Sequence, residues 1–409
     1  MYQCIYENQR PIRTCGDNEM DMIRLGDVCE LLNGFAFKSE NYVDFGIRVI
    51  RIANVQKGFI EDSTPAFYPI DSEGVDKFML EENDLLMSLT GNVGRVAILA
   101  KEFLPAALNQ RVACLRMKSD KILKRYLFHI LNSDFFEQQC IKSSKGVAQK
   151  NMSIEWLKEY EIPLYPLEKQ KEIVTVLDNA LNIIKERKQQ LSNLDTLIKA
   201  QFVEIFGDML INEKEWTEKQ LDSVADIVSG ITKGRKVKTK ELSEVPYMAV
   251  SNVKDGFIDW TTVKTIMATR SEIDQYRLMP GDVLMTEGGD PDKLGRGAII
   301  QEPPKNCIHQ NHIFRVRLDQ DSILPVFMSQ YLQQQKAKRY FYRCAKQTTG
   351  IASINMKQLK ALPVLIPPIE IQREYATFVA QIDKSKATVK KALNEAQLLF
   401  DGLMQQYFG

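Results

Sequence analysis

The chain has 409 residues, of which 44% are hydrophobic and 26% charged, and its formal net charge is +1. This length is too great for one ordinary core and predicts two or three domains of a globular protein. The near-neutral charge excludes a uniform polycation, so any nucleic acid would have to bind through local basic surface. No apolar run approaches the ~18 residues that a membrane span needs, so we expect no membrane partner.

Residues 1–22 are predicted to be a polar N-terminal extension, because they lack the basic start and apolar core of a secretory signal. The seven cysteines are scattered and form no C-x-x-C pair. Such spacing is typical of reduced thiols, and we therefore expect a cytoplasmic protein.

Beyond this extension, the chain contains two copies of one repeated unit. Residues 52–60 read IANVQKGFI and residues 250–258 read VSNVKDGFI. Seven further pairs keep the same order: LGDV with LDSV, DLLMSLTG with DVLMTEGG, GRVAI with GRGAI, NQR with HQN, GVAQKNM with GIASINM, YPLEKQKE with PPIEIQRE, and FG with FG. The offset drifts only between 196 and 204 residues. A period of half the chain predicts a duplicated domain pair rather than a solenoid.

The first part of each copy, residues 23–165 and 208–366, is predicted to be a mixed α+β globule. Its short apolar stretches are separated by Gly, Asn, Asp and Pro, which is the pattern of strands joined by turns. Helical stretches are expected between the strands, at 121–139 and 324–339. In the doubled nonapeptide, Asn54 and Asn252 are expected to shape a turn that Gly58 and Gly256 close.

The last part of each copy, residues 166–207 and 367–409, is predicted to be a long helix. Apolar residues recur at alternating spacings of three and four, which favours an antiparallel coiled-coil seam between the two helices. The antiparallel arrangement is expected because residues 207–220 can reach at most ~50 Å, less than the ~58 Å of a 39-residue helix. Arg187 and Lys386 interrupt the seam, either to set its register or to reach solvent from its edge. The predicted seam residues are Ile173, Leu177, Ile184, Leu191, Leu194, Ile198, Val379, Ile382, Val389, Leu393, Phe400 and Leu403.

The sequence carries no motif for catalysis. It contains no Gly-Lys dipeptide for a phosphate loop, and its Pro-Pro pairs do not fit an amino-methyltransferase loop. Cys307, His309 and His312 resemble metal ligands, but the matched residues of the first copy hold no Cys or His. We therefore expect neither a metal site nor catalytic residues in this chain.

Polar loops between the predicted strands are the candidates for DNA binding. The most basic is ITKGRKVKTK at 231–240, which faces NGFAFKSEN at 33–41 in the first copy. Arg, Asn and Gln pair with base edges and Lys with phosphates, although each of these residues could equally be an ordinary exposed side chain. The candidates are Lys38, Arg95, Asn109, Gln110, Arg111, Lys145, Gln149, Lys150, Lys233, Arg235, Lys236, Lys238, Lys293, Arg296, His309, Gln310, Asn311, Lys346 and Gln347.

From residue 24 to 409 the chain resembles the specificity subunits of bacterial Type I restriction–modification systems. The resemblance is carried by the doubled motifs, among them DLLMSLTGNVGRVAI with DVLMTEGGDPDKLGRGAI, and GVAQKNMS…EIPLYPLEKQ with GIASINMK…LIPPIEIQ. It implies two target-recognition domains that each read one half of a split sequence in double-stranded DNA. It also implies that the long helices act as a ruler between the two halves.

The resemblance further implies a non-catalytic chain that docks two methyltransferase subunits, together with restriction/translocase subunits. These partners are expected to use S-adenosylmethionine, ATP and Mg, with no cofactor in this chain. Two alternatives remain open at this point. The chain could instead serve a fused restriction–modification enzyme that cuts on both sides of its site, or it could be a two-headed protein-binding scaffold.

Overall fold

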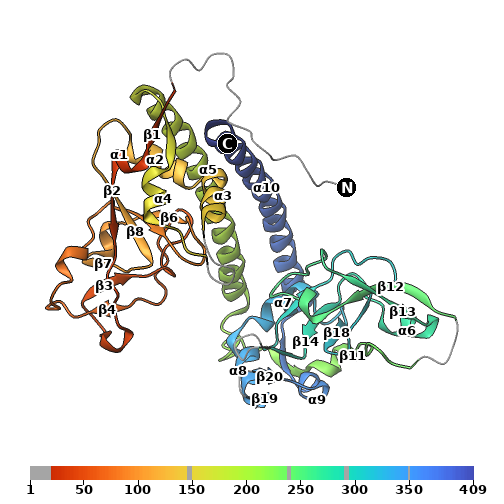
Figure 1. Cartoon of the computed structure of the whole chain (residues 1–409). Coiled ribbons are helices and arrows are strands. Elements are labelled where there is room, and N and C mark those ends of the chain that lie inside the picture. The colour runs from red at the N-terminus through yellow and green to blue at the C-terminus, as the bar shows by residue number, and fades with distance from the viewer. Residues whose placement is uncertain (1–19, 145–149, 237–240, 290–293, 349–350) are drawn as a thin grey trace. The chain divides into compact units, whose positions relative to one another are not determined.

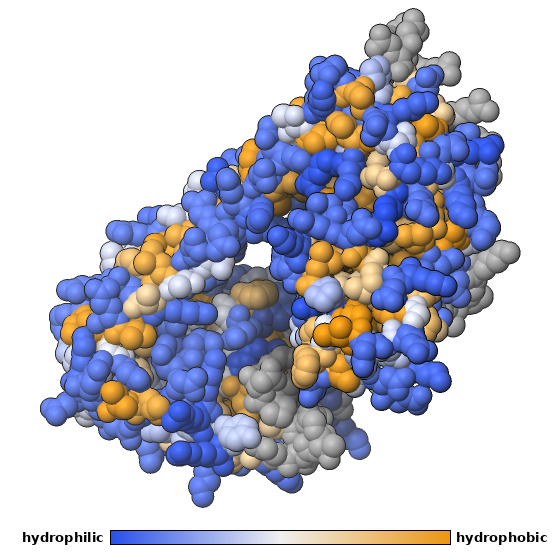
Figure 2. Space-filling view, turned by 90° about the vertical axis from the view of Figure 1, so that its left-hand side faces the viewer, coloured by the Kyte–Doolittle hydropathy of each residue, from blue (hydrophilic) through white to orange (hydrophobic). Residues whose placement is uncertain are grey.

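The computed structural model describes residues 20–144, 150–236, 241–289, 294–348 and 351–409 (Figure 1). The chain forms two compact units, one made of residues 1–188 with 391–409 and the other of residues 189–390. Within the described ranges, no helix is long and apolar enough to cross a membrane. On the face shown in Figure 2, hydrophilic residues predominate and hydrophobic residues lie between them.

Unit 1 is built around a four-stranded antiparallel sheet in the order β2-β8-β5-β6. A second sheet, β4-β3-β7, pairs β3 and β7 in parallel, and β1 pairs with β9. The strands are β1 Asp21–Arg24, β2 Cys29–Asn33, β3 Ile47–Ile50, β4 Phe67–Tyr68, β5 Leu85–Ser88, β6 Val96–Ile98, β7 Ala106–Leu108, β8 Val112–Met117 and β9 Glu161–Leu164. The helices are α1 Leu25–Val28, α2 Lys124–Leu131, α3 Asp134–Ser143, α4 Ile154–Glu159 and the first part of α5 Leu167–Phe206.

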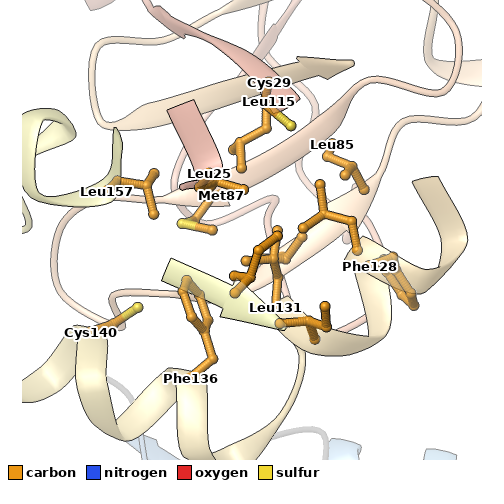
Figure 3. Close-up of a cluster of buried hydrophobic side chains, with 14 of the residues drawn as sticks. Leu25, Cys29, Leu85, Met87, Leu115, Phe128, Leu131, Phe136, Cys140 and Leu157 are labelled. Carbon is orange, nitrogen blue, oxygen red and sulfur yellow. The ribbon is translucent and has the colours of Figure 1, made fainter. Parts of the chain in front are cut away.

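Strand β5 is buried on both faces, which explains its continuous apolar sequence. Leu85 and Met87 point into the larger core, where they join residues of α1, α2 and α3 (Figure 3). Leu86 points to the other side, into a core shared with β3 and β7. Because successive side chains of a strand point to opposite faces, β5 contributes apolar side chains to both cores.

Unit 2 repeats this architecture. Its main sheet has the order β11-β18-β14-β16, and its second sheet, β13-β12-β17, again contains one parallel pair. The strands are β10 Thr217–Gln220, β11 Ala225–Ser229, β12 Ser243–Met248, β13 Lys264–Ala268, β14 Val283–Thr286, β15 Gly288–Gly289, β16 Gly297–Ile299, β17 Ile308–His309, β18 Ile313–Leu318, β19 Lys346–Thr348, β20 Ile351–Ser353 and β21 Pro363–Ile366. The helices are α6 Arg270–Tyr276, α7 Pro325–Leu332, α8 Gln335–Cys344, α9 Met356–Lys360 and the first part of α10 Ile369–Phe408. The predicted duplication and the α+β class are both confirmed.

The doubled nonapeptide is a turn of the shared frame, as predicted. Asn54 and Asn252 are buried, and each accepts a hydrogen bond from the backbone three residues earlier, at 2.9 Å in both units. Their amide nitrogens donate across the turn to the carbonyls of Glu61 and Asp259. Gly58 and Gly256 adopt positive φ angles of 91° and 81°, which glycine tolerates best.

Two further buried contacts recur in both units. Asp84 and Asp282, at equivalent positions in the two units, accept hydrogen bonds from Arg116 and Arg317 of the neighbouring strand. A fully buried glutamine, Gln170 in α5 and Gln372 in α10, ties the first turn of each long helix to the loop before α2 or α7. These contacts fix the direction in which each helix leaves its unit.

The helices α5 and α10 each have 40 residues and contribute to both units. In unit 2, the Tyr375 ring near the start of α10 lies 5.5 Å and 5.4 Å from the rings of Phe202 and Phe206 at the end of α5. Further along, Lys386 of α10 pairs with Asp195 of α5 at 2.6 Å. Residues later in α10 thus contact residues earlier in α5, so the two helices run antiparallel in this unit.

Unit 1 has the matching arrangement with the helices exchanged. Met404 and Phe408, at the end of α10, belong to the same buried cluster as Ile173 and Leu177 of α5. Tyr126 of α2 lies in this cluster too, with its ring 5.7 Å from that of Phe408. The last turns of each long helix therefore complete the core of a unit whose sheet comes from the other copy of the repeat.

The predicted seam residues are all at least partly buried, but not all against the other helix. Ile173, Leu177, Ile184 and Val389 are buried, and the remaining eight are partly buried. Those at the helix starts lie in cores that the globule shares with the last turns of the other long helix. A full-length coiled coil therefore stays a prediction, whereas the antiparallel direction is confirmed in unit 2.

Candidate nucleic-acid interface

In each unit, several loops meet at one end of the main sheet. In unit 1, β2 ends at Asn33 opposite Ala113, and β5 ends at Ser88 opposite Val112, where β8 begins. The loops that follow β2, β5 and β7 therefore leave the sheet side by side, and an isolated bridge from Thr90 adds a fourth segment. We call residues 34–38, 89–95, 109–111 and 150–152 the loop edge of unit 1.

The loop edge of unit 2 consists of the matching segments, residues 230–236, 287–289, 294–296, 310–312 and 352–354. Its strands end in the same way, with Ser229 opposite Phe314 and Thr286 opposite Ile313. The close approach of the loops requires glycine at Gly34 and Gly230, where a Cβ would collide with the backbone of the β7 or β17 turn. The sequence therefore places its polar loops on equivalent, rigidly supported edges.

The structure corrects the alignment of the two copies by one residue at this edge. Asn109 donates its backbone N–H to Ile50, and Gln310, not His309, makes the matching bond to Met248. Likewise the backbone carbonyl of Arg111 accepts from Leu89, and that of His312 accepts from Glu287. The residues Asn109, Gln110 and Arg111 therefore correspond to Gln310, Asn311 and His312.

His309 is wrong as a DNA-contact residue. It occupies the position of the buried Leu108 and is itself fully buried, with Nδ1 3.1 Å from the backbone oxygen of Ile313. Burial lowers the pKa of His309 to about 4, so the ring is neutral at pH 7. The sequence alignment of NQR with HQN was wrong by one residue. Both segments consist of polar residues, so their sequences did not reveal the shift.

In unit 1, Gln110 and Arg111 are the exposed side chains of the turn between β7 and β8. Asn109 is partly buried, and its Oδ1 accepts the backbone N–H of Arg111 at 3.2 Å, which orients the turn. Arg95 is also partly buried and donates to the Gln56 side chain. The backbone carbonyl of Lys150 accepts the backbone N–H of Gly91 at 2.9 Å, and Lys150 is partly buried.

The loop after β2 in unit 1 exposes fewer side chains that could contact DNA than its sequence suggests. Lys38 is exposed, with Glu40 3.9 Å away. Phe35 and Phe37 are not free to stack on bases, because their rings lie 5.1 Å apart and continue into Phe78 and Tyr68. These aromatic residues stabilise the loop instead.

The basic loop of unit 2 contains one structural arginine. The guanidinium of Arg235 donates to both carboxylate oxygens of Glu272, at 2.5 and 2.6 Å, and to the backbone of Met267. Arg235 in turn lowers the pKa of Glu272 to about 2. Lys233 and Lys236 are exposed beside this anchor and remain available for phosphates.

The other candidates of unit 2 differ in their surroundings. Gln310 and Asn311 are partly buried, and Gln310 accepts the backbone N–H of Val250 at 3.4 Å. Arg296 is partly buried in a hollow that Asp255 and Lys338 also line. Lys346 is exposed on β19. Lys145, Gln149, Lys238 and Lys293 lie outside the described residues, as does the side chain of Gln347.

Sequence reasoning missed two residues of the loop edge of unit 2, Glu287 and His312. His312 was considered only as a metal ligand, and Glu287 was hidden by its match to an apolar residue. Their side chains pair with each other, with His312 Nδ1 2.5 Å from Glu287 Oε2. Among the residues that the structure describes, no three His, Cys, Asp or Glu side chains are grouped to hold a metal ion.

Comparison with known proteins places these features in one family. The family model for the Type I restriction modification DNA specificity domain matches the chain twice, over residues 17–193 and 213–398. The specificity subunit of the Type I restriction enzyme EcoKI from Escherichia coli K12 is 23% identical over 92% of this chain and 85% of its own length. The EcoBI specificity subunit, also from Escherichia coli, is 24% identical over 94% of this chain and 83% of its own length.

A solved structure has the same fold. The S subunit of a Type I restriction–modification system from M. genitalium matches 98% of this chain and 99% of its own, with a TM-score of 0.56 and 16% sequence identity. The two family matches coincide with the two copies of the repeat and account for most of the chain. The chain therefore belongs to the family of Type I restriction modification DNA specificity domains and carries two of them in tandem.

Proposed function

We propose that this chain is the DNA-recognition subunit of a Type I restriction–modification complex, and that each unit reads one half of a bipartite target in double-stranded DNA. The observation that carries this proposal is the pair of loop edges. Both rest on the same frame of buried Asn, Asp–Arg and Gln contacts, yet the side chains that they expose differ. A shared frame with different exposed side chains is what two readers of unlike sequences need.

Physical limits on one unit favour the use of two. A mismatched base pair costs about 1–3 kcal/mol, so a unit with a few reading side chains selects only a few bases. Two units joined rigidly multiply their selectivity, provided that the spacing between the half-sites is correct. We propose that α5 and α10, each ~60 Å long, act as the ruler that sets this spacing.

We propose that the same helices dock the methyltransferase subunits. Leu399 of α10 is 59% exposed and Leu197 of α5 is 43% exposed, and both stand at the same distance before the Phe that ends the helix. Exposed leucines at matching places suit two copies of one apolar partner. Restriction/translocase subunits would complete the complex in the cytoplasm. The partners would use S-adenosylmethionine, ATP and Mg, and this chain would itself be non-catalytic.

The recognition proposal is tested by expressing the chain with its methyltransferase subunits in a host without adenine methylation. Single-molecule sequencing of the genomic DNA should then find one methylated motif of two unlike halves separated by a constant gap. Methylation without such a motif, or no methylation by a correctly assembled complex, would overturn the proposal. A co-purifying partner that holds methylase and nuclease in one chain would instead indicate the fused type of enzyme.

The docking proposal is tested by counting methyltransferase subunits with native mass spectrometry. We expect two subunits on the wild-type chain, one on either Leu399→Glu or Leu197→Glu, and none on the double variant. The exposed Lys391→Glu substitution on α10 is the matched control. Unchanged stoichiometry in the double variant would refute docking at these positions.

A further inference from the structure

The two loop edges carry unlike side chains at one pair of equivalent backbone positions. Leu89 and Glu287 are equivalent, because each donates its backbone N–H to the turn after β7 or β17, at 2.9 and 3.0 Å. Each also accepts a backbone N–H, from Met152 or Ile354, at 2.9 and 2.8 Å. The backbone role of this position is therefore the same in both units.

The side chains at this position are not the same. Leu89 is 6% exposed and fills the core of unit 1, so the frame accepts an apolar residue here. Glu287 keeps 35% of its side chain exposed at the surface of unit 2. The frame therefore does not require the carboxylate, and an isolated acid would oppose the binding of phosphates. Its presence at the loop edge calls for a specific partner.

Two neighbouring side chains hold this carboxylate in place. His312 Nδ1 contacts Glu287 Oε2, and Asn311 Nδ2 lies 3.3 Å from His312 Nε2. A neutral ring with its proton on Nδ1 satisfies both contacts at once, because it donates to Glu287 and accepts from Asn311. Among the described residues, Glu287 Oε1 has no hydrogen-bond partner. His312 therefore holds one carboxylate oxygen and leaves the other available to a ligand.

Two of these side chains, Glu287 and His312, border an open hollow. Glu287 and His312 line it together with Gly288, Ser353 and Val250. The hollow measures about 350 Å³, which is enough for the edge of a base. The matching turn of unit 1 instead presents Arg111, an exposed guanidinium without a hydrogen-bond partner among the described residues.

Resting on the recognition function proposed above, we propose that Glu287, His312 and Asn311 are the base-reading array of unit 2, and that Arg111 takes this role in unit 1. A carboxylate accepts from the exocyclic amino group of cytosine or adenine, and Asn pairs with adenine. Arginine pairs with O6 and N7 of guanine. Unit 2 therefore selects a base with an exocyclic amino group in the major groove, and unit 1 selects guanine.

The test uses the complete complex and sequencing of its methylated motif. We expect Glu287→Gln and His312→Ala to relax one position in one half of the motif, where discrimination falls about 5- to 150-fold, while the other half stays unchanged. Arg111→Ala should relax a guanine position in the other half. Glu302→Gln is the matched control, because it neutralises an exposed acid of unit 2 in the loop beyond β16, away from the loop edge.

An unchanged motif and unchanged discrimination in both Glu287→Gln and His312→Ala would overturn the proposal. If a variant complex assembles but methylates nothing, its binding is compared on cognate DNA and on DNA with one scrambled half-site. Equal binding of the variant to the cognate and the scrambled DNA supports the array. A retained preference for the cognate DNA overturns it. Failure of the wild-type complex to methylate any bipartite motif would instead defeat the recognition function on which the array rests.

Discussion

The core of unit 1 should depend on a residue at the far end of the chain. Phe408 is 7% exposed, and it joins the buried cluster of unit 1 although the last strand of that unit, β9, ends at Leu164. We expect Phe408→Ala to destabilise unit 1 selectively. The matched variant Phe206→Ala should act on unit 2 in the same way, because Phe206 ends the other long helix.

The magnitudes follow from burial. Replacing a buried Phe by Ala costs about 3–5 kcal/mol, as lost transfer free energy plus a cavity. Phe408 ends its helix and keeps some exposure, so we expect ~3 kcal/mol, near the lower end of that range. Phe206 is 1% exposed, and its ring lies 4.8 Å from those of Phe202 and Phe327. We therefore expect ~4 kcal/mol for Phe206→Ala.

Hydrogen–deuterium exchange resolved by peptide measures each unit separately. A loss of ~3 kcal/mol should speed exchange in β5 and β8 roughly 150-fold, because exchange from opened states follows the opening free energy. Peptides of β14 and β18 should change little in Phe408→Ala and strongly in Phe206→Ala. Leu398→Ala, at a side chain 72% exposed on the same helix, is the control. Equal acceleration in both units, or none in unit 1, would refute the reasoning.

Three other outcomes follow from single contacts. Asn252→Ala should lower the free energy of unfolding by about 3 kcal/mol in a denaturant titration, because it removes a fully buried side chain and leaves its backbone partners unsatisfied; a loss below about 0.5 kcal/mol would contradict this. Glu272→Gln should cost about 1–2 kcal/mol at pH 7, and since the folded pKa of Glu272 is depressed to about 2, the difference from wild type should vanish as pH falls from about 4.5 through 2; a pH-independent difference would argue against the Arg235 pair. Proline at Ile184 or Leu393 should abolish assembly with methyltransferase subunits by breaking a long helix, and normal co-purification would count against the ruler.

The placement of the loop edge shows where sequence reasoning stops. Charge and composition drew attention to Arg235, but its partner Glu272 lies on α6, and no local pattern joins the two residues. The one-residue shift that exchanges His309 for Gln310 became visible only in the backbone hydrogen bonds. Register in a sheet decides which side chains face the core. An alignment wrong by one residue therefore made the buried His309 a predicted DNA-contact residue.

By itself, the sequence determined that the chain is duplicated, that each copy is an α+β globule followed by a long helix, and that polar loops carry what differs between the copies. These features rest on local periodicity and on ordered repetition, both of which are visible in a single amino-acid sequence. Only the tertiary structure decided which core each helix end completes and which polar side chains stand free at the loop edge. Burial and pairing depend on residues distant in the chain, and an apolar stripe shows that a face must be covered without showing what covers it.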